Sequence, residues 1–155
     1  EAHEIPAKPL DPYSYYNGDF IALEKAHLNK GWKLVDNWHP DNKAGKRNGF
    51  VDVPMLEATR PGDRLTLDFQ GKAIGIFCVS GPSAGILEYS ADGAPFKELD
   101  TFTEWSHNLY IPWVYMLETE LKDMDHKLVL RISKKKNPAS QGTECQIRNF
   151  VVNGR

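Results

Sequence analysis

The chain has 155 residues, of which 41% are hydrophobic and 26% charged, values that suit one globular domain with its own core. Its 19 basic and 21 acidic residues give a net charge of −2, which excludes binding to nucleic acid through a basic surface. The basic run Lys134–Lys136 leads into Asn137-Pro138 and predicts a solvated loop. No apolar stretch reaches the roughly 20 residues that span a bilayer, and the first residues form no secretion signal, so we expect no membrane partner.

Residues 1–18 contain proline and tyrosine without any regular hydrophobic period. Such a composition predicts a linker, or an extended arm that packs onto the domain. The domain itself is expected to cover residues 19–155.

From residue 19 onward, short runs that alternate between apolar and polar residues are separated by turn residues, which predicts an all-β, antiparallel β-sandwich or jelly roll. Only Glu118–Met124 has the character of a short helix. Asp92-Gly93 lies between two alternating runs and predicts a hairpin, because both residues tolerate a positive φ. The predicted strands are, in chain order, 20–28, 32–38, 49–58, 65–69, 73–80, 86–90, 96–102, 109–117, 127–132 and 146–152.

Cys78 and Cys145 each lie in an apolar alternating run. Two buried free thiols are expected, and a single disulfide between them is the alternative. The five histidines have no i, i+2 or i, i+4 pair, so the sequence predicts no zinc site and no cofactor. A structural calcium ion would suit a sandwich, but no segment resembles a calcium-binding loop.

Two short patterns are shared with serine hydrolases. Gly81–Gly85 reads GPSAG and matches G-x-S-x-G, but a nucleophile elbow needs a helix after Ser83, and strand residues follow it here. Asp123-Met124-Asp125-His126 is a D-x-x-H pattern that precedes a predicted strand and is typical of a polar turn. We therefore predict no catalytic residue in this chain.

All four tryptophans lie in the two aromatic, polar segments 32–49 and 100–113. Aromatic rings beside planar polar side chains can hold sugars, because a pyranose stacks its apolar face on a ring. Trp32 and Trp113 are expected in the core, whereas Trp38 and Trp105 are open to packing or to binding. The predicted ligand-binding residues are Trp38 and Trp105 as stacking platforms, with Arg47, His107 and Tyr110 as polar partners.

A set of short motifs is spread over Pro9–Gly154. The motifs are Tyr16–Gly18, Gly31–Val35, Gly49–Val51, Val53–Leu56, Ala73–Phe77, Gly81-Pro82, Ala84-Gly85, Glu88–Ser90, Asp92-Gly93, Phe102-Thr103, Trp105-Ser106, Pro112-Trp113, and Asn137, Ser140 and Gly142 before Cys145. Together they resemble the β-sandwich accessory domain that follows the catalytic domain in bacterial SGNH/GDSL-type hydrolases of polysaccharide-degrading bacteria. The resemblance implies a galactose-binding-like jelly roll beside an esterase, in a family whose members often have aspartate at the position of Ser83.

Three hypotheses for the function follow. The first is a non-catalytic, carbohydrate-binding module of a secreted hydrolase, with a polysaccharide or oligosaccharide and a catalytic hydrolase domain as partners. The second is a structural domain that packs on that catalytic domain and shapes its active site. The third is a self-sufficient esterase that uses Ser83 and His126. An extracellular or periplasmic location is expected, with the export signal outside this chain.

Overall fold

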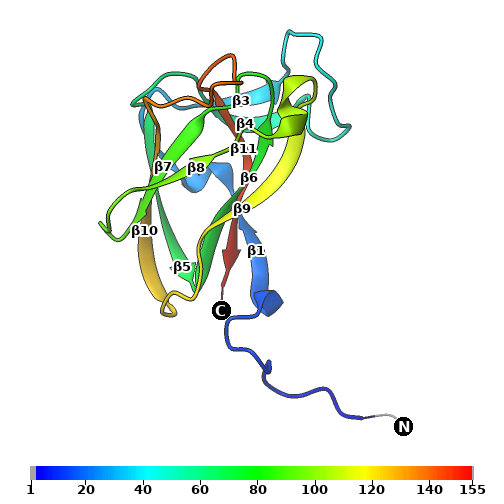
Figure 1. Cartoon of the computed structure of the whole chain (residues 1–155). Helices are drawn as coiled ribbons and strands as arrows, with labels where there is room; N and C mark the ends of the chain where they lie inside the picture. The colour runs from blue at the N-terminus through cyan, green and yellow to red at the C-terminus, as the bar shows by residue number, and fades with distance from the viewer. Residues whose placement is uncertain (1–2, 155) are drawn as a thin grey trace.

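A computed structural model describes residues 3–154 and confirms the all-β prediction, with two antiparallel sheets packed as a sandwich (Figure 1). One sheet has the strand order β3-β4-β11-β6-β9, with β1 also paired to β11, and the other has the order β2-β5-β10-β7-β8. We call them sheets A and B. The strands of sheet A are β1 (Gly18–Ile21), β3 (Lys33–Trp38), β4 (Val53–Ala58), β6 (Ala73–Ser80), β9 (Ile111–Glu118) and β11 (Cys145–Asn153); those of sheet B are β2 (His27–Lys30), β5 (Arg64–Gly71), β7 (Ile86–Ala91), β8 (Lys97–Asp100) and β10 (Met124–Ile132).

The main core lies between the sheets and follows from the alternation of side chains along each strand. In β5, Leu65, Leu67 and Phe69 point inward and are buried, and on β10 Leu128, Leu130 and Ile132 do the same. The central strand β6 is buried along most of its length, as its continuous apolar sequence predicts.

A second, smaller core covers one half of the outer face of sheet A. Trp38, Met55, Val79 and Tyr110 are buried there, and residues 39–52 fold over them as a loop. Phe50 from this loop packs edge-on against Phe77 of β6, with ring centroids 5.3 Å apart. Trp38 is thus packed in this second core, and its side chain also borders the groove described below.

The Asp92-Gly93 hairpin is confirmed: both residues have a positive φ, of 52° and 77°, and β7 pairs with β8 across the turn. The predicted strand 20–28 is instead divided. Its first part, β1, lies in sheet A, and its last residues belong to β2 in sheet B. The 3₁₀-helix η2 (Leu23–Lys25) joins them and buries Leu23, so the chain changes sheets there.

The predicted helix at Glu118–Met124 is wrong. Glu118 ends β9, Met124 begins β10, and Glu120 has a φ of 57°, which a right-handed helix cannot contain. The prediction that Trp113 is buried is also wrong, because Trp113 is 50% exposed on β9, an edge strand of sheet A. An edge strand can extend beyond the opposite sheet, and its inward side chains are then only partly covered.

Cys78 and Cys145 are both buried free thiols. Burial raises the pKa of Cys78 to about 12, with a smaller opposing effect of its hydrogen bond to Ser80. Burial also raises the pKa of Cys145. Both thiols are therefore protonated at neutral pH, and the first of the two predicted alternatives for these cysteines is the one observed.

Residues 3–14 have no helix or strand and are mostly exposed, but the end of this segment is attached to the sandwich. Lys72 Nζ donates to the carbonyl of Pro12 at 3.1 Å, and Asn153 Nδ2 donates to that of Ser14 at 2.9 Å. The role of residues 1–18 as a linker or as an extended arm stays a prediction. Residues 1 and 2 of that segment, and residue 155 of the predicted domain, lie outside the described residues. Nowhere in residues 3–154 is a helix long and apolar enough to cross a membrane.

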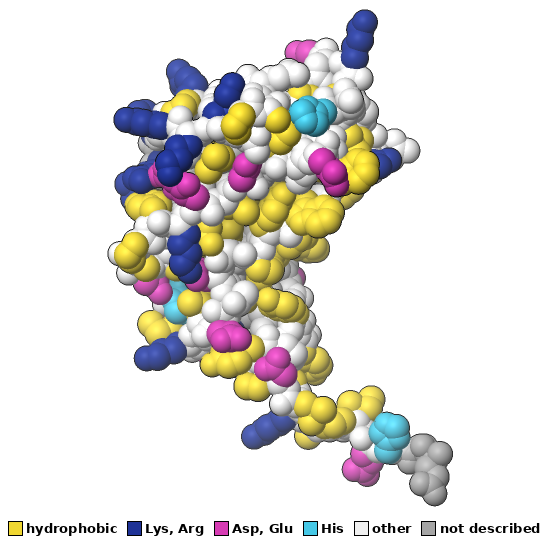
Figure 2. Space-filling model, in the orientation of Figure 1, with side chains coloured by type: hydrophobic (Ala, Val, Ile, Leu, Met, Phe, Trp, Pro, Cys, Tyr) yellow, Lys and Arg dark blue, Asp and Glu magenta, His cyan; other side chains and the backbone are white. Residues whose placement is uncertain are grey.

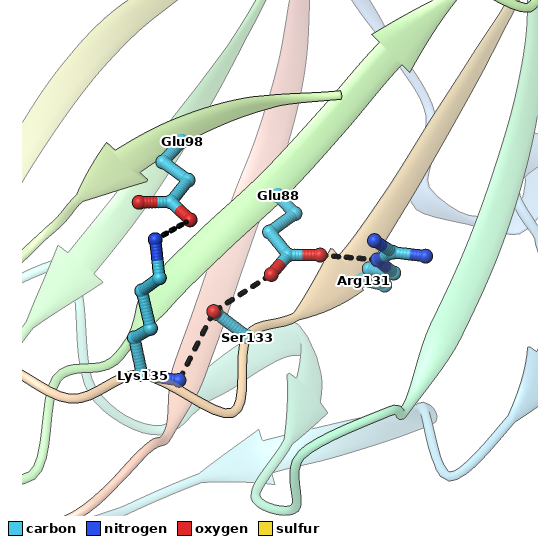
Figure 3. A network of polar contacts seen from close by, with 5 residues as sticks. All are labelled: Glu88, Glu98, Arg131, Ser133 and Lys135. Atoms are coloured by element: carbon cyan, nitrogen blue, oxygen red, sulfur yellow. Dashed lines mark hydrogen bonds and ion pairs between the residues drawn. The ribbon is translucent and has the colours of Figure 1, made fainter. Parts of the chain in front are cut away.

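The outer face of sheet B carries a network of charges (Figure 3). Glu88 on β7 binds Arg131 of β10 and accepts a hydrogen bond from Ser133 Oγ at 2.8 Å, while Lys135 pairs with Glu98. Burial alone would raise the pKa of Glu88, but its bonds to Ser133 and Arg131 hold it below the ordinary value. Lys134–Lys136 are exposed without regular structure, so the predicted solvated loop is confirmed.

Candidate functional site: a polar groove over buried aromatic rings

Three loops meet at the end of the sandwich that lies opposite the described termini (Figure 1). They are residues 39–52, residues 81–85 and residues 133–144. Short parallel bridges hold them in place, one from Gly45 to Leu109 and one from Ala84 to Glu144. The 3₁₀-helix η3 (Glu104–His107) lies at the same end, because Gly45 N donates to Asn108 O at 2.7 Å.

The floor of this end is aromatic. Trp38 and Tyr110 pack edge to face, with ring centroids 5.4 Å apart and an interplanar angle of 71°. Trp38 is only 4% exposed, so it offers an edge and not an open face to a ligand. Burial raises the pKa of Tyr110, whose hydroxyl oxygen accepts a hydrogen bond from Asn42 Nδ2 at 2.7 Å.

Planar polar side chains surround these rings. Trp38 Nε1 donates to Glu57 Oε1 at 3.1 Å, and Gln146 Nε2 lies within 3.4 Å of Glu57 Oε1 and 3.3 Å of Glu144 Oε2. Together they form a groove of about 570 Å³, a size that suits a small sugar. Its lining consists of Val35, Asn37, Trp38, His39, Pro40, Asp41, Asn42, Glu57, Ser83, Tyr110, Glu144 and Gln146.

The carboxylates of the groove influence each other. Burial raises the pKa of Glu144, the hydrogen bond from Gln146 opposes this, and the negative charge of Glu57 raises it further. Lys33 Nζ lies 3.0 Å from Glu57 Oε2 and balances that charge from the side. The groove is therefore rich in hydrogen-bond acceptors beside two aromatic rings, an arrangement that can bind hydroxyl groups.

The predicted ligand-binding residues are divided by the structure. Trp38 and Tyr110 line the groove. Trp105 is 60% exposed on η3. His107, also on η3, and Arg47, in the loop of residues 39–52, are exposed, and none of the three lines the groove. His107 packs edge-on against Phe102, with ring centroids 5.0 Å apart. Binding by these five residues stays a prediction, while Glu57, Glu144 and Gln146 are new candidates.

Ser83 and His126 are not brought together. Ser83 lines the groove, next to the start of β7, whereas His126 is near the start of β10. Ile132, at the other end of β10, pairs with Leu87 of β7. It lies six positions along the strand from His126, a distance of about 20 Å. The two residues also border different cavities. The GPSAG and D-x-x-H patterns therefore do not form a catalytic pair.

His126 is buried in sheet B and contacts Phe69, Asp92 and Lys122. Its ring stacks on Phe69 at a centroid distance of 5.2 Å, its Nδ1 lies 2.6 Å from Asp92 Oδ2, and its Nε2 lies 2.8 Å from the Lys122 carbonyl oxygen. Burial lowers the pKa of His126, but the bonds to Lys122 and Asp92 outweigh this and raise it. Both ring nitrogens thus face acceptors, which favours the imidazolium form.

Replacing His126 with glutamine is expected to cost more stability in mild acid than in alkali. A raised folded-state pKa means that the stabilisation is complete below the unfolded value of about 6.5 and is lost as the pH rises through the folded value. Urea unfolding of both proteins at pH 6 and pH 9 measures this difference. A gap between wild type and His126→Gln that widens as the pH rises would contradict the assignment.

Among residues 3–154 there is no group of three or more side chains arranged to hold a metal ion. That the chain has no cofactor stays a prediction. A structural calcium ion, which no sequence motif indicates, also stays an untested possibility of the fold.

Comparison with solved structures shows where this fold occurs. A two-domain esterase (CEX) active on acetylated mannans, co-crystallized with mannopentaose, aligns over 98% of this chain with a TM-score of 0.69 and 17% identity. A family two carbohydrate esterase from Cellvibrio japonicus aligns over 89% with a TM-score of 0.53 and 12% identity. The exo-beta-1,3-galactanase of Phanerochaete chrysosporium aligns over 87% with a TM-score of 0.56 and 12% identity.

This chain matches only a part of each of these proteins. It spans 40% of the two-domain esterase, 34% of the second esterase and 29% of the galactanase. No family model and no curated protein matches the chain. At these identities the similarity shows the fold, a β-sandwich that also occurs as part of larger carbohydrate-active enzymes.

Proposed function

We propose that the chain is a non-catalytic accessory module of a secreted, carbohydrate-active hydrolase of the SGNH/GDSL esterase type, and that it binds a glycan in the groove. A catalytic hydrolase domain and a polysaccharide or oligosaccharide are its partners. The observation that carries the proposal is the groove itself, in which Glu57, Glu144 and Gln146 border the rings of Trp38 and Tyr110.

Each part of the groove suits a sugar. Carboxylate and amide groups form the planar, directional hydrogen bonds that distinguish sugar hydroxyls, and ring edges cover the apolar C–H groups between them. Trp105 lies outside the groove at the same end of the molecule, exposed enough to stack on a further sugar unit. The solved structures of similar fold support the proposal, because they include a two-domain esterase active on acetylated mannans and a family two carbohydrate esterase, and this chain spans a minor part of each.

A second candidate function is favoured by the uncovered half of the outer face of sheet A. Phe20, Val114, Met116 and Val151 border an apolar groove of about 590 Å³ between β1 and β9. Hydrophobic side chains gather along this side of the molecule (Figure 2). Phe20 and Val114 are exposed on this half, so it would suit packing against the catalytic domain. In this alternative, the chain would shape the partner's active site without binding glycan.

Two tryptophans of similar exposure provide a matched test of glycan binding. Trp105→Ala is expected to weaken the binding of mannopentaose about tenfold, because a stacked ring contributes about 1.4 kcal/mol. Trp113→Ala, on β9 and outside the groove, is expected to leave the affinity unchanged. Tyr110→Phe keeps the buried ring but removes the hydroxyl, and a fivefold to tenfold loss of affinity is expected, since one hydrogen bond contributes about 1 kcal/mol.

Isothermal titration calorimetry of the wild-type chain and the three variants measures these effects, with thermal unfolding to check the fold. A first screen by affinity gel electrophoresis should include mannans, β-1,3-galactan and xylan. If the folded wild-type chain binds none of them, glycan binding is ruled out and the packing function is favoured. If Trp105→Ala and Trp113→Ala bind like wild type while Tyr110→Phe does not, the groove alone forms the site.

A further inference from the structure

The charged side chains of the groove are unevenly distributed. Of the residues that line it, Asp41, Glu57 and Glu144 carry carboxylates, and none is lysine or arginine. Lys33 Nζ is paired with Glu57 Oε2 at 3.0 Å, and the lining histidine, His39, has its Nδ1 3.0 Å from Asp52 Oδ1. An anionic ligand in this groove would therefore meet three carboxylates and no lysine or arginine among the described residues that line it.

Gln146 fixes two of these carboxylates in place. Its side chain is buried in β11, and its amide nitrogen lies between Glu57 Oε1 and Glu144 Oε2 at 3.4 and 3.3 Å. An amide nitrogen has two hydrogens, so one can be donated to each carboxylate. Trp38 Nε1 adds a third donor, at 3.1 Å from Glu57. These hydrogen bonds hold the two glutamates side by side.

Hydrogen-bond polarity adds to the effect of charge. An ionised carboxylate only accepts hydrogen bonds, and a sugar hydroxyl can donate one, whereas the carboxylate of a uronic acid cannot. Among the described residues, the Glu144 side chain has a single hydrogen bond, from Gln146 to Oε2, so Oε1 is available to a ligand. Tyr110 receives its hydrogen bond from Asn42 and keeps its own hydroxyl proton for donation. A hydroxyl can satisfy both of these groups.

From these observations we infer that the groove selects neutral glycans over glycans that contain uronic acids, and that the Glu57–Gln146–Glu144 arrangement determines this selectivity. The inference rests on the proposed glycan-binding function and names its ligand class. A ligand carboxylate that lies several ångströms from two groove carboxylates is repelled by both. In water-exposed surroundings this repulsion lowers the affinity about tenfold.

The selectivity is tested by measuring the affinities for mannopentaose and for trigalacturonic acid at pH 7.5 and low salt. Wild type is expected to prefer mannopentaose at least tenfold, and the preference should decrease as salt screens the charges. Glu144→Gln keeps the shape of the side chain and removes its charge, so the preference should decrease about fivefold. Asp123→Asn makes the same change in net charge just before the start of β10, outside the groove, and should leave the preference unchanged.

The outcomes separate this inference from the proposed function. If neither oligosaccharide binds and the wider glycan screen is also negative, the glycan-binding function itself is wrong. If trigalacturonic acid binds as tightly as mannopentaose, or more tightly, the function stands and the selectivity is overturned. Equal effects of Glu144→Gln and Asp123→Asn would assign the preference to overall charge and contradict the role of the groove carboxylates.

Discussion

Phe150→Ala is expected to destabilise the fold by about 4 kcal/mol, because removing a fully buried aromatic ring costs its transfer energy and leaves a cavity. Phe150 is 0% exposed at the centre of the main core, on β11, where it pairs with Ile21 of β1 on one side and Ile76 of β6 on the other. For a domain of this size, the loss corresponds to a decrease in melting temperature of about 12 °C.

Phe20→Ala is the matched control, because it removes the same ring from the next position of the same β1–β11 strand pair, on the opposite face of the sheet. Phe20 pairs with Val151 and is 59% exposed. A cost below about 1 kcal/mol is expected for it. Denaturant unfolding of both variants measures the difference, and similar losses for the two would mean that the described core is wrongly placed.

Much of the fold could be predicted because local patterns determine it. The alternation of Leu65, Leu67 and Phe69 specifies which face of β5 is buried, and Asp92-Gly93 specifies its hairpin, since both effects act within a few residues. Where the prediction was wrong, distant contacts decided the outcome. Trp113 follows a core-like alternation, but β9 is an edge strand of sheet A and the ring is half exposed.

The groove was only half predictable for the same reason. Trp38 and Tyr110 were chosen by residue type, but their burial depends on residues 39–52, which fold over them. Glu57 and Gln146 were missed because they belong to strands that are 89 residues apart in the chain and meet only through the pairing of β4 with β11. The available signal was weak: Glu57 is the one charged residue of β4, but Gln146 is only one of several polar residues of β11.

GPSAG has a structural explanation that its resemblance to a nucleophile elbow did not suggest. A Cβ on Gly81 would lie 2.1 Å from the ring of Tyr110, and a Cβ on Gly85 would lie 2.6 Å from the carbonyl group of Thr143. Both glycines are therefore needed for close packing beside the groove. Gly85 also donates from its backbone to Glu144 O at 2.8 Å, so its position determines where Glu144 lies.

Gly85→Ala is accordingly expected to destabilise the fold by about 3 kcal/mol and to weaken glycan binding as well. Its methyl group would meet rigid backbone, so residues 143 and 144 must move, and overpacking of this kind costs about 1–3 kcal/mol. Gly62→Ala is the control: its φ of 85° is strained for alanine, at about 1 kcal/mol, but no atom lies within 4 Å of the added methyl group. If Gly85→Ala unfolds at the same denaturant concentration as Gly62→Ala, the close approach to Thr143 does not constrain the loop. A loss of stability with unchanged glycan affinity would instead mean that the packing of Gly85 stabilises the fold but does not determine the position of Glu144.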